Sequence, residues 1–200
     1  MPRESLPSTK RKQSNGLLAH ARTDKQTSAK AYPADSDGSK YDRGHMVPAN
    51  HLDYSTAAAK SSNAMSNILP QHYGLNRGAW LLTEEIVECH RDVEPLSVVG
   101  GAIYHNLDGY DNFAHFDNAL ESHGVRTPAF YWKVIRGSSG GLIAWILPNR
   151  DVKRADLDEW IVSVADIEAA TGVHFPGLNE EEKSRSPAAS WALPSGCDKS

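Results

Sequence analysis

The tetrad Asp42-Arg43-Gly44-His45 concentrates residue types that can hydrolyse a phosphodiester bond. Such hydrolysis needs a base to deprotonate water, a cation for the phosphoryl oxygens and stabilisation of the leaving oxygen. His45 suits the first task because an unperturbed imidazole has a pKa of about 6.5. Arg43 can donate two parallel hydrogen bonds to a phosphate group. Four residues match by chance in many chains, so the hypothesis depends on the residues that follow them.

Asn67, Asn76 and Glu84 supply oxygen atoms that a hard cation prefers. Neutral amide oxygens suit Mg²⁺, which takes few protein ligands and keeps most of its water molecules. Apolar residues recur at near-helical spacing from Leu75 to Asp92, and Pro95 follows. On one such helix, Asn76 and Glu84 would lie on a similar face about two turns apart. The pattern therefore predicts that a single helix carries both residues.

Each of these residues also has a structural interpretation when it is taken alone. A lone histidine is more often a surface or structural residue, and an asparagine after a glycine usually forms a turn or caps a helix. His51, His72 and His90 flank the same region and suggest zinc, but their spacing fits no helix-borne pair or standard ligand set. The motif and its spacing together carry the hypothesis of a phosphodiesterase site.

The elements that must position these residues form a mixed α+β pattern. Pro48 follows the tetrad closely, which places the tetrad on or beside a short strand that this proline ends. The glycine pair within residues 96–104 predicts a strand that bends or bulges. The other strands are expected at 17–19, 129–135 and 142–147, with a hairpin turn at 136–141. A short helix or ordered turn is expected at 55–64, and a helix is expected at 158–171 with Gly172 as its C-terminal stop.

We predict one domain over residues 16–178, preceded by a flexible lead-in at 1–15 and followed by a loosely ordered tail at 179–200. The net charge is −4, with nine Lys and Arg against five Asp and Glu in residues 1–45, and twelve against twenty in the remainder. The basic excess lies beside the tetrad, where a polyanion would need it. A solubilising basic tail explains the same excess equally well.

Cysteine content and hydropathy leave the cellular compartment open. A disulfide between Cys89 and Cys197 and a pair of free thiols are both consistent with the sequence. Because no apolar run approaches the roughly 20 residues that span a bilayer, no membrane partner is expected. Residues 1–16 lack the apolar core of a secretory signal peptide. Secretion or delivery into a target cell fits the sequence as well as a cytoplasmic location does.

Four blocks of the sequence, in order, resemble the DNA/RNA non-specific endonucleases, the ββα-metal family that includes secreted bacterial nucleases and mitochondrial endonuclease G. Residues 42–49 (DRGHMVPA) resemble the signature of this family. Residues 66–71 and 75–80 resemble its second block at the expected spacing, and Glu84 falls where the family has a glutamate near the metal. Residues 132–135, 144–149 and 166–172 resemble its later strands and final helix, so the likeness covers residues 39–178.

The resemblance implies an α+β fold in which a ββα-metal finger is built on a central, mostly antiparallel sheet with flanking helices. It implies a sugar-non-specific, Mg²⁺-dependent hydrolase that leaves 5′-phosphate and 3′-hydroxyl ends, with Mn²⁺ or another divalent cation as a substitute. The resemblance implies that His45, Arg43 and Glu84 are catalytic, with His45 as the general base. Asn76 would be the direct metal ligand, and Asn67 and Glu84 would support the metal waters and the base. Arg43 and Arg77 would contact the phosphate, and Asp42 would be a scaffold residue.

The chain departs from the family pattern upstream of the tetrad, where family members usually carry a further arginine. Arg22 and Lys30 are the candidates to replace it. DNA and RNA are the expected substrates, while the preference between them and the oligomeric state remain open. Two alternatives also remain: a toxin, effector or inactive relative that acts mainly by binding an inhibitor, immunity or other partner protein, and a phosphodiesterase for small nucleotides.

Overall fold

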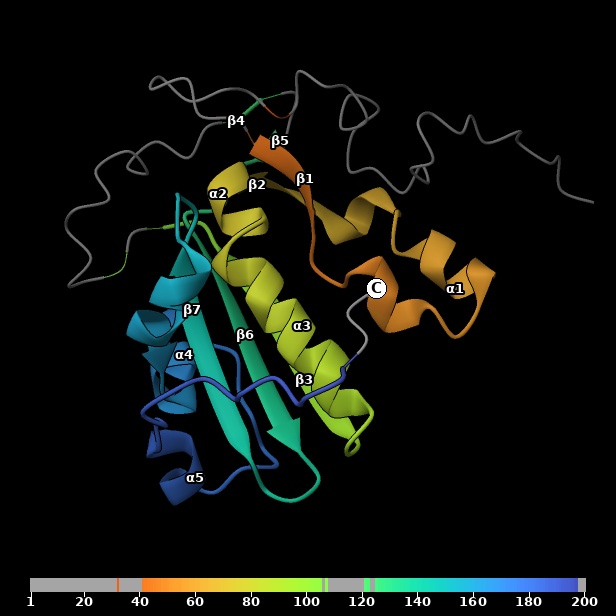
Figure 1. Cartoon of the computed structure of the whole chain (residues 1–200). Helices are drawn as coiled ribbons and strands as arrows, with labels where there is room; N and C mark the ends of the chain where they lie inside the picture. The colour runs from red at the N-terminus through yellow and green to blue at the C-terminus, as the bar shows by residue number, and fades with distance from the viewer. Residues whose placement is uncertain (1–31, 33–40, 106, 108–120, 123–124, 198–200) are drawn as a thin grey trace, which may run out of the picture.

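The computed structural model describes residue 32 and residues 41–105, 107, 121–122 and 125–197 (Figure 1). The expected strand at 17–19, the lead-in at 1–15 and the arginine candidates Arg22 and Lys30 lie outside the described residues. In the part of the chain that is described, no helix is long and apolar enough to cross a membrane.

A four-stranded antiparallel sheet forms the centre of the fold, in the order β3 (Leu96–Ile103), β6 (Phe130–Gly137), β7 (Leu142–Pro148) and β8 (Ile161–Val162). The predicted hairpin of β6 and β7 is confirmed. β3 contains no bulge, one of the two forms predicted for it, because it pairs with β6 without interruption. Gly101 serves a close approach instead: a Cβ atom there would lie 2.6 Å from Nε1 of Trp132 on the neighbouring strand.

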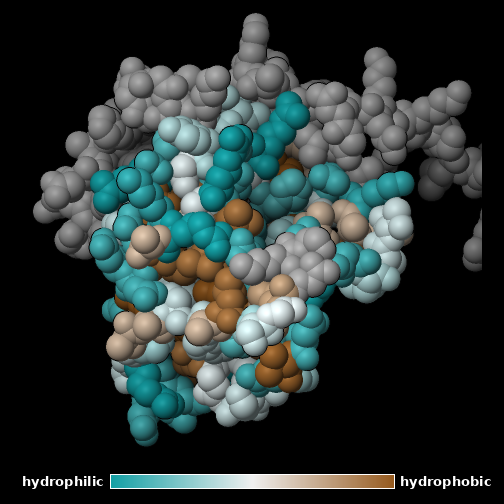
Figure 2. All heavy atoms as spheres, in the orientation of Figure 1, coloured by the Kyte–Doolittle hydropathy of each residue, from teal (hydrophilic) through white to brown (hydrophobic). Residues whose placement is uncertain are grey.

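Alternation along β6 divides the core between the two faces of the sheet. Tyr131 and Ile135 belong to the cluster that includes residues of α3 (Ala79–Arg91). Trp132 and Val134 belong to the cluster that includes residues of α4 (Val164–Thr171). Figure 1 shows α3 lying along the sheet, and Figure 2 shows apolar side chains over the middle of this face. The expected α+β class with an antiparallel sheet and flanking helices is confirmed.

A two-stranded antiparallel unit, here called the finger, consists of β1 (Tyr41–His45) and β2 (Ile68–His72). Between its strands the chain forms η2 (Ala49–Leu52), α1 (Thr56–Ser61) and η3 (Met65–Asn67), so the helix expected at 55–64 is confirmed over its central part. The finger leads into α2 (Tyr73–Asn76) and then α3, which is the expected ββα order. A further short pair consists of β4 (Glu121–Ser122) and β5 (Val125–Arg126).

Asn149, the residue after β7, ties the finger to the central sheet. Its amide oxygen accepts a hydrogen bond from the His72 backbone N–H at 2.7 Å, and its amide nitrogen donates to the carbonyls of Pro70 and Pro128 at 3.0 and 2.8 Å. The hydroxyl of Tyr131 on β6 donates to the same Pro70 carbonyl at 3.0 Å. These buried hydrogen bonds fix β2, and with it the finger, against the end of the β6–β7 hairpin.

The prediction of one helix from Leu75 to Asp92 is wrong. The backbone leaves helical geometry at Gly78, where ψ is −114°, and α3 begins at Ala79. The Ala79 N–H donates to the carbonyl of Val152 at 3.0 Å rather than to the preceding turn. A Cβ atom on Gly78 would lie 2.3 Å from the carbonyl oxygens of Val152 and Gly74, so this crossing requires glycine. Asn76 and Glu84 therefore lie on two separate helices.

The helix predicted over residues 158–171 is present only in its second half. A 3₁₀ helix, η5 (Arg154–Trp160), and the short strand β8 occupy the first part. Ser163 then starts α4 through a capping box with Asp166, because each side chain accepts from the other residue's backbone N–H. Gly172 ends α4 in the left-handed conformation, at φ 71°, as predicted.

The segment after Leu178, expected to be loosely ordered, packs onto the domain as far as it is described. It contains α5 (Glu180–Ser184), and farther on the Trp191 ring lies 5.1 Å from the ring of His90. Cys197 forms a disulfide with Cys89 near the end of α3, which decides the cysteine alternative left open by the sequence. The C-terminal segment is thus held covalently to the helix that carries Glu84.

We expect Cys197→Ser to lower the free energy of unfolding by about 2–4 kcal/mol, because the bridge joins residues 108 positions apart and restricts the unfolded chain. Urea unfolding followed by tryptophan fluorescence measures the change. Ser195→Ala, an exposed position in the same segment, is the matched control. Equal unfolding midpoints for the two variants would contradict the prediction.

Candidate active site

Asp42 joins the finger to α2 through three hydrogen bonds to its carboxylate. The side-chain amide nitrogen of Asn76 donates to Oδ2 at 3.0 Å. Arg77 donates from Nε to Oδ2 and from Nη2 to Oδ1, both at 2.9 Å. Because a carboxylate only accepts hydrogen bonds, it fixes the amide of Asn76 with the nitrogen toward Asp42. The carbonyl oxygen of Asn76 is therefore the end available to another group.

The two arginines differ in their surroundings. Arg77 is 69% exposed in its side chain and uses two of its five N–H donors on Asp42. The guanidinium of Arg43 lies over the ring of Tyr32, 5.4 Å from its centroid. Phosphate contact by either arginine stays a prediction. In Arg77, the N–H groups that do not donate to Asp42 are the ones available for a phosphate.

Asn63 holds the imidazole of His45, a partner that the sequence analysis missed. Nε2 of His45 lies 3.1 Å from Oδ1 of Asn63. With this oxygen facing the ring, Nε2 carries the proton and Nδ1 keeps its lone pair. The tetrad's Gly44 also has a structural cause, since a Cβ atom there would lie 2.3 Å from the buried side chain of Gln71.

Asn67 is bound to main-chain groups on both sides of the loop that connects the finger strands. Its amide oxygen accepts from the Val47 N–H at 2.9 Å, and its amide nitrogen donates to the carbonyls of Val47 and Ser62 at 2.7 and 2.8 Å. The Asn67 carbonyl also accepts from the N–H of Met46 at 3.0 Å. Asn67 thus fixes the backbone that directly follows His45, and a role toward metal waters stays a prediction.

Glu84 lies half-buried on α3. Burial raises the pKa of its carboxyl to about 6, and the charge of Lys133 acts in the opposite direction. Its backbone carbonyl accepts a hydrogen bond from Nε2 of His51 at 3.1 Å. Glu84 and Asn76 are brought into the site by different helices, so their relative position depends on the break at Gly78 rather than on helical periodicity.

His51 is partly buried and belongs to no standard zinc set in the described part of the chain. Burial lowers its pKa to about 4; the hydrogen bond to the Glu84 carbonyl opposes this, while Lys133 and Arg91 lower the pKa further and Asp53 raises it. The described residues contain no group of three or more His, Cys, Asp or Glu that could hold a metal ion. The three flanking histidines bond to main-chain groups instead, namely His51 to Glu84, His72 to Gly74 and His90 to Ala192.

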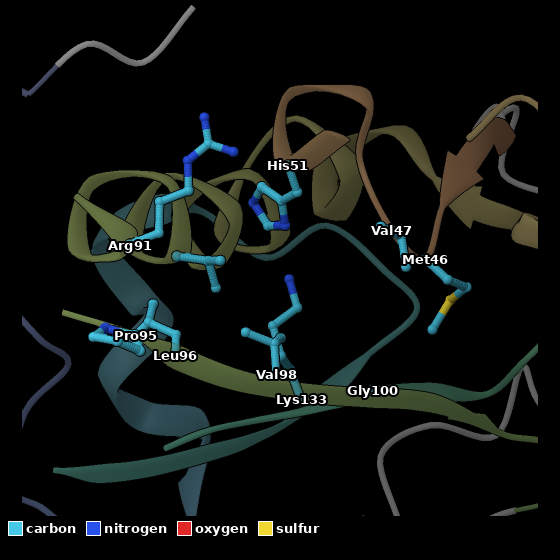
Figure 3. A pocket seen from close by; sticks show the side chains of 10 residues that line it. Met46, Val47, His51, Arg91, Pro95, Leu96, Val98, Gly100 and Lys133 are labelled. Atoms are coloured by element: carbon cyan, nitrogen blue, oxygen red, sulfur yellow. The ribbon is translucent and has the colours of Figure 1, made fainter. Parts of the chain in front are cut away.

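A cavity of about 380 Å³ lies between α3, β3 and the segment that follows His45 (Figure 3). Apolar side chains form much of its lining, among them Met46, Val87 and Val98. Figure 3 shows the Lys133 side chain rising from the sheet into this space, with His51 on the opposite side. The sequence analysis did not single out Lys133.

Residues 8–180 match the sequence profile of the family described as DNA/RNA non-specific endonuclease. The chain belongs to this family. It is 28% identical over 180 residues to the nuclease of Serratia marcescens, which covers 82% of this chain and 64% of that protein. It is 31% identical over 162 residues to the mitochondrial nuclease EXOG of Homo sapiens, covering 74% of this chain and 44% of that protein. The chain therefore spans less than two thirds of the length of these relatives.

A similar fold is found in the crystal structure of EndoG in complex with EndoGI. The TM-score is 0.60 at 24% sequence identity, and the match covers 74% of this chain and 64% of that chain. This likeness concerns the fold, whereas the family assignment rests on the sequence match. The sequence-based recognition of the DNA/RNA non-specific endonuclease family is confirmed.

We expect Asn67→Ala to lower the free energy of unfolding by about 1–3 kcal/mol, because main-chain groups of Val47 and Ser62 lose their partner. Asn76→Ala removes one hydrogen bond to Asp42 and should cost less than about 1 kcal/mol. Urea denaturation of both variants measures the difference. If the two variants unfold at the same urea concentration, Asn67 does not have the structural role that its hydrogen bonds indicate.

His51 should make the fold sensitive to acid. Because its folded pKa of about 4 lies below the unfolded value of 6.5, the unfolded chain binds more protons between these pH values, and stability falls as pH drops through this window. Between pH 7 and pH 4.5, we expect the free energy of unfolding of His51→Asn to fall by about 2–3 kcal/mol less than that of the wild type, as measured by urea unfolding. His174→Asn, at an exposed position, should behave as wild type; an unchanged loss in His51→Asn would contradict the prediction.

Proposed function

We propose that the chain is a metal-dependent endonuclease that hydrolyses DNA and RNA to 5′-phosphate and 3′-hydroxyl ends. The observation that carries this proposal is the hydrogen bond from the Asn76 amide nitrogen to the carboxylate of Asp42, which leaves the carbonyl oxygen of Asn76 available to another group. This geometry agrees with an oxygen ligand at Asn76. Membership of the DNA/RNA non-specific endonuclease family supports the reaction class.

The residues present fit a divalent cation that takes few protein ligands. Asn76 would bind it through a neutral oxygen, and Glu84 would accept hydrogen bonds from its water molecules. A sparse, oxygen-based donor set suits Mg²⁺, or Mn²⁺ in its place, and differs from the nitrogen and sulfur sets typical of structural zinc. When bound, such a cation supplies charge neutralisation at the leaving 3′ oxygen.

His45 would act as the general base through Nδ1. Its Nε2–H is held by Asn63, so the lone pair on Nδ1 can take a proton from the attacking water. The hydrogen bond from Nε2–H to the amide oxygen of Asn63 would be kept while Nδ1 takes the proton. Arg43 and the free donors of Arg77 would contact the phosphate and hold it in line with the water.

The proposed lack of sugar preference follows from the kind of groups in the site. The candidate residues bind phosphate oxygens, a cation and water, which DNA and RNA share. Contacts to phosphate position a nucleic acid, whereas contacts to base edges read its sequence. The site as described therefore acts on the backbone that the two polymers have in common.

We expect His45→Ala to reduce the rate of cleavage by about 10²–10⁴-fold, the usual contribution of a general base, and Asn76→Ala to reduce it comparably. Cleavage of circular single- and double-stranded DNA and of RNA, with Mg²⁺ and with chelator, measures the effect. His174→Ala is the matched control at an exposed position. Robust cleavage by His45→Ala would contradict the proposed mechanism. Conversion of circular DNA to nicked or linear forms would establish endonuclease action.

The same assay separates the alternatives. Cleavage of dinucleotides without cleavage of polymers would favour a phosphodiesterase for small nucleotides. A protein that cleaves neither would favour a role through binding, as a toxin, effector or inactive relative with an inhibitor or immunity partner. The hydrogen bonds that hold His45 and Asn76 favour activity, because a binding module has no need to orient these two groups.

A further inference from the structure

Lys133 is a buried cation on the face of the sheet that α3 covers. It lies on β6 between Tyr131 and Ile135, both core residues, and it is 2% exposed. An ammonium group loses its hydration when it is buried, so such a lysine persists only where specific partners compensate it. An apolar side chain of the same length would occupy this position at lower cost, and the charge therefore calls for an explanation.

The ammonium of Lys133 is held from the α3 side. Nζ donates to Oγ1 of Thr83 at 2.6 Å and lies 3.9 Å from the centroid of the Trp80 ring. The hydroxyl of Thr83 donates in turn to the Trp80 carbonyl at 2.7 Å, which leaves its oxygen free to accept from Lys133. These contacts fix the ammonium beside the residue that follows Thr83, which is Glu84.

The glutamates of α3 differ in the cations that accompany them. Glu85 is bound by Arg154 through two hydrogen bonds of 2.8 Å. Glu88 forms an ion pair with Arg91 one turn farther along the helix. The carboxylate of Glu84, in contrast, interacts with the positive charge of Lys133.

Burial acts on Lys133 and Glu84 in opposite senses. It lowers the pKa of Lys133 to about 8 and raises that of Glu84 to about 6, while each group's charge counteracts the shift of the other. Each of the two groups thus favours the charged form of the other.

We propose that Lys133 is a positioning residue of the active site, whose ammonium, fixed by Thr83 and Trp80 of α3, orients the neighbouring Glu84 carboxylate. This inference rests on the proposed function, in which Glu84 accepts hydrogen bonds from waters of the bound cation. Lys133 itself touches neither substrate nor reacting atoms. It acts through Glu84.

The test is a double-mutant cycle with Lys133→Met, Glu84→Gln and the double variant. Methionine keeps the length of the side chain, and the adjoining cavity leaves it room. In steady-state cleavage with Mg²⁺, we expect Lys133→Met to lower kcat at least tenfold while KM changes less than threefold. In the Glu84→Gln background, the same substitution should lower kcat less than twofold. Lys153→Met, at an exposed position, is the matched control.

A purely structural role predicts a different result, in which the losses in kcat multiply in the double variant. That outcome, or an unchanged kcat in Lys133→Met, would overturn the proposal. Lys133→Arg keeps the charge and should recover part of the kcat lost in Lys133→Met. No recovery in a Lys133→Arg protein that unfolds at the wild-type urea concentration would also count against it.

Urea unfolding of the same four proteins provides a readout that does not depend on activity. Each single variant leaves one buried charge without its counterion, so the double variant should unfold at a higher urea concentration than Lys133→Met. If the wild type cleaves no nucleic acid, the proposed function fails, and this cycle still decides whether Lys133 and Glu84 act together. Additive shifts in the unfolding midpoint would show that they do not.

Discussion

The carboxylate of Asp42 is the contact on which the candidate site depends, because it connects two elements that the chain builds separately. His45 ends β1, whereas Asn76 ends α2, and the finger loop and β2 lie between them. As a contribution to stability, an ion pair with a 69%-exposed arginine is weak. The contact instead orients the side chain of Asn76. The two ends of an asparagine amide are nearly the same in shape, and a hydrogen-bond acceptor such as a carboxylate selects the nitrogen end, so the oxygen end faces outward.

The central sheet supplies the fixed frame for this contact. Asn149 and Tyr131 bind β2 from the end and the face of the β6–β7 hairpin, so the finger cannot shift without breaking buried hydrogen bonds. On the other side, α3 is fixed at its start by the Val152 carbonyl and near its end by the disulfide at Cys89. Glu84 lies between these two anchors. The site therefore combines groups from a hydrogen-bonded finger and from a helix restrained near both ends.

Local sequence patterns predicted the elements whose causes are local. The hairpin of β6 and β7 follows from apolar runs around a glycine- and serine-rich turn, and Gly172 ends α4 as its position indicated. The break at Gly78 could not be predicted in this way, because the acceptor that replaces the helical hydrogen bond belongs to Val152. The same holds for the C-terminal segment, which contacts α4 through Lys183 and Glu168 and α3 through the disulfide. Tertiary partners decided each of these cases.

The candidate site was predicted at the level of residue types but not of their contacts. The tetrad and the spacing to Asn67 and Asn76 indicated which side chains matter, while the partners Asn63 and Val47 are defined only by the folded loop. Lys133 is different, since its sequence signal was visible. A single lysine within the apolar run of residues 130–135 breaks the pattern of a strand buried on both faces, and such a break is typical of a functional charge.

Charge compensation in the candidate site is consistent with the proposed action of an acidic chain on a polyanion. Asp42 is neutralised by Arg77, Glu85 by Arg154 and Glu88 by Arg91, so these carboxylates repel a phosphate little. Lys133, the cation that interacts with Glu84, is itself buried and does not screen a phosphate from this carboxylate. A phosphate could approach Glu84 only with a further positive charge between them. In the proposed function a divalent cation at Asn76 would supply that charge, so the proposed reaction would depend on the metal.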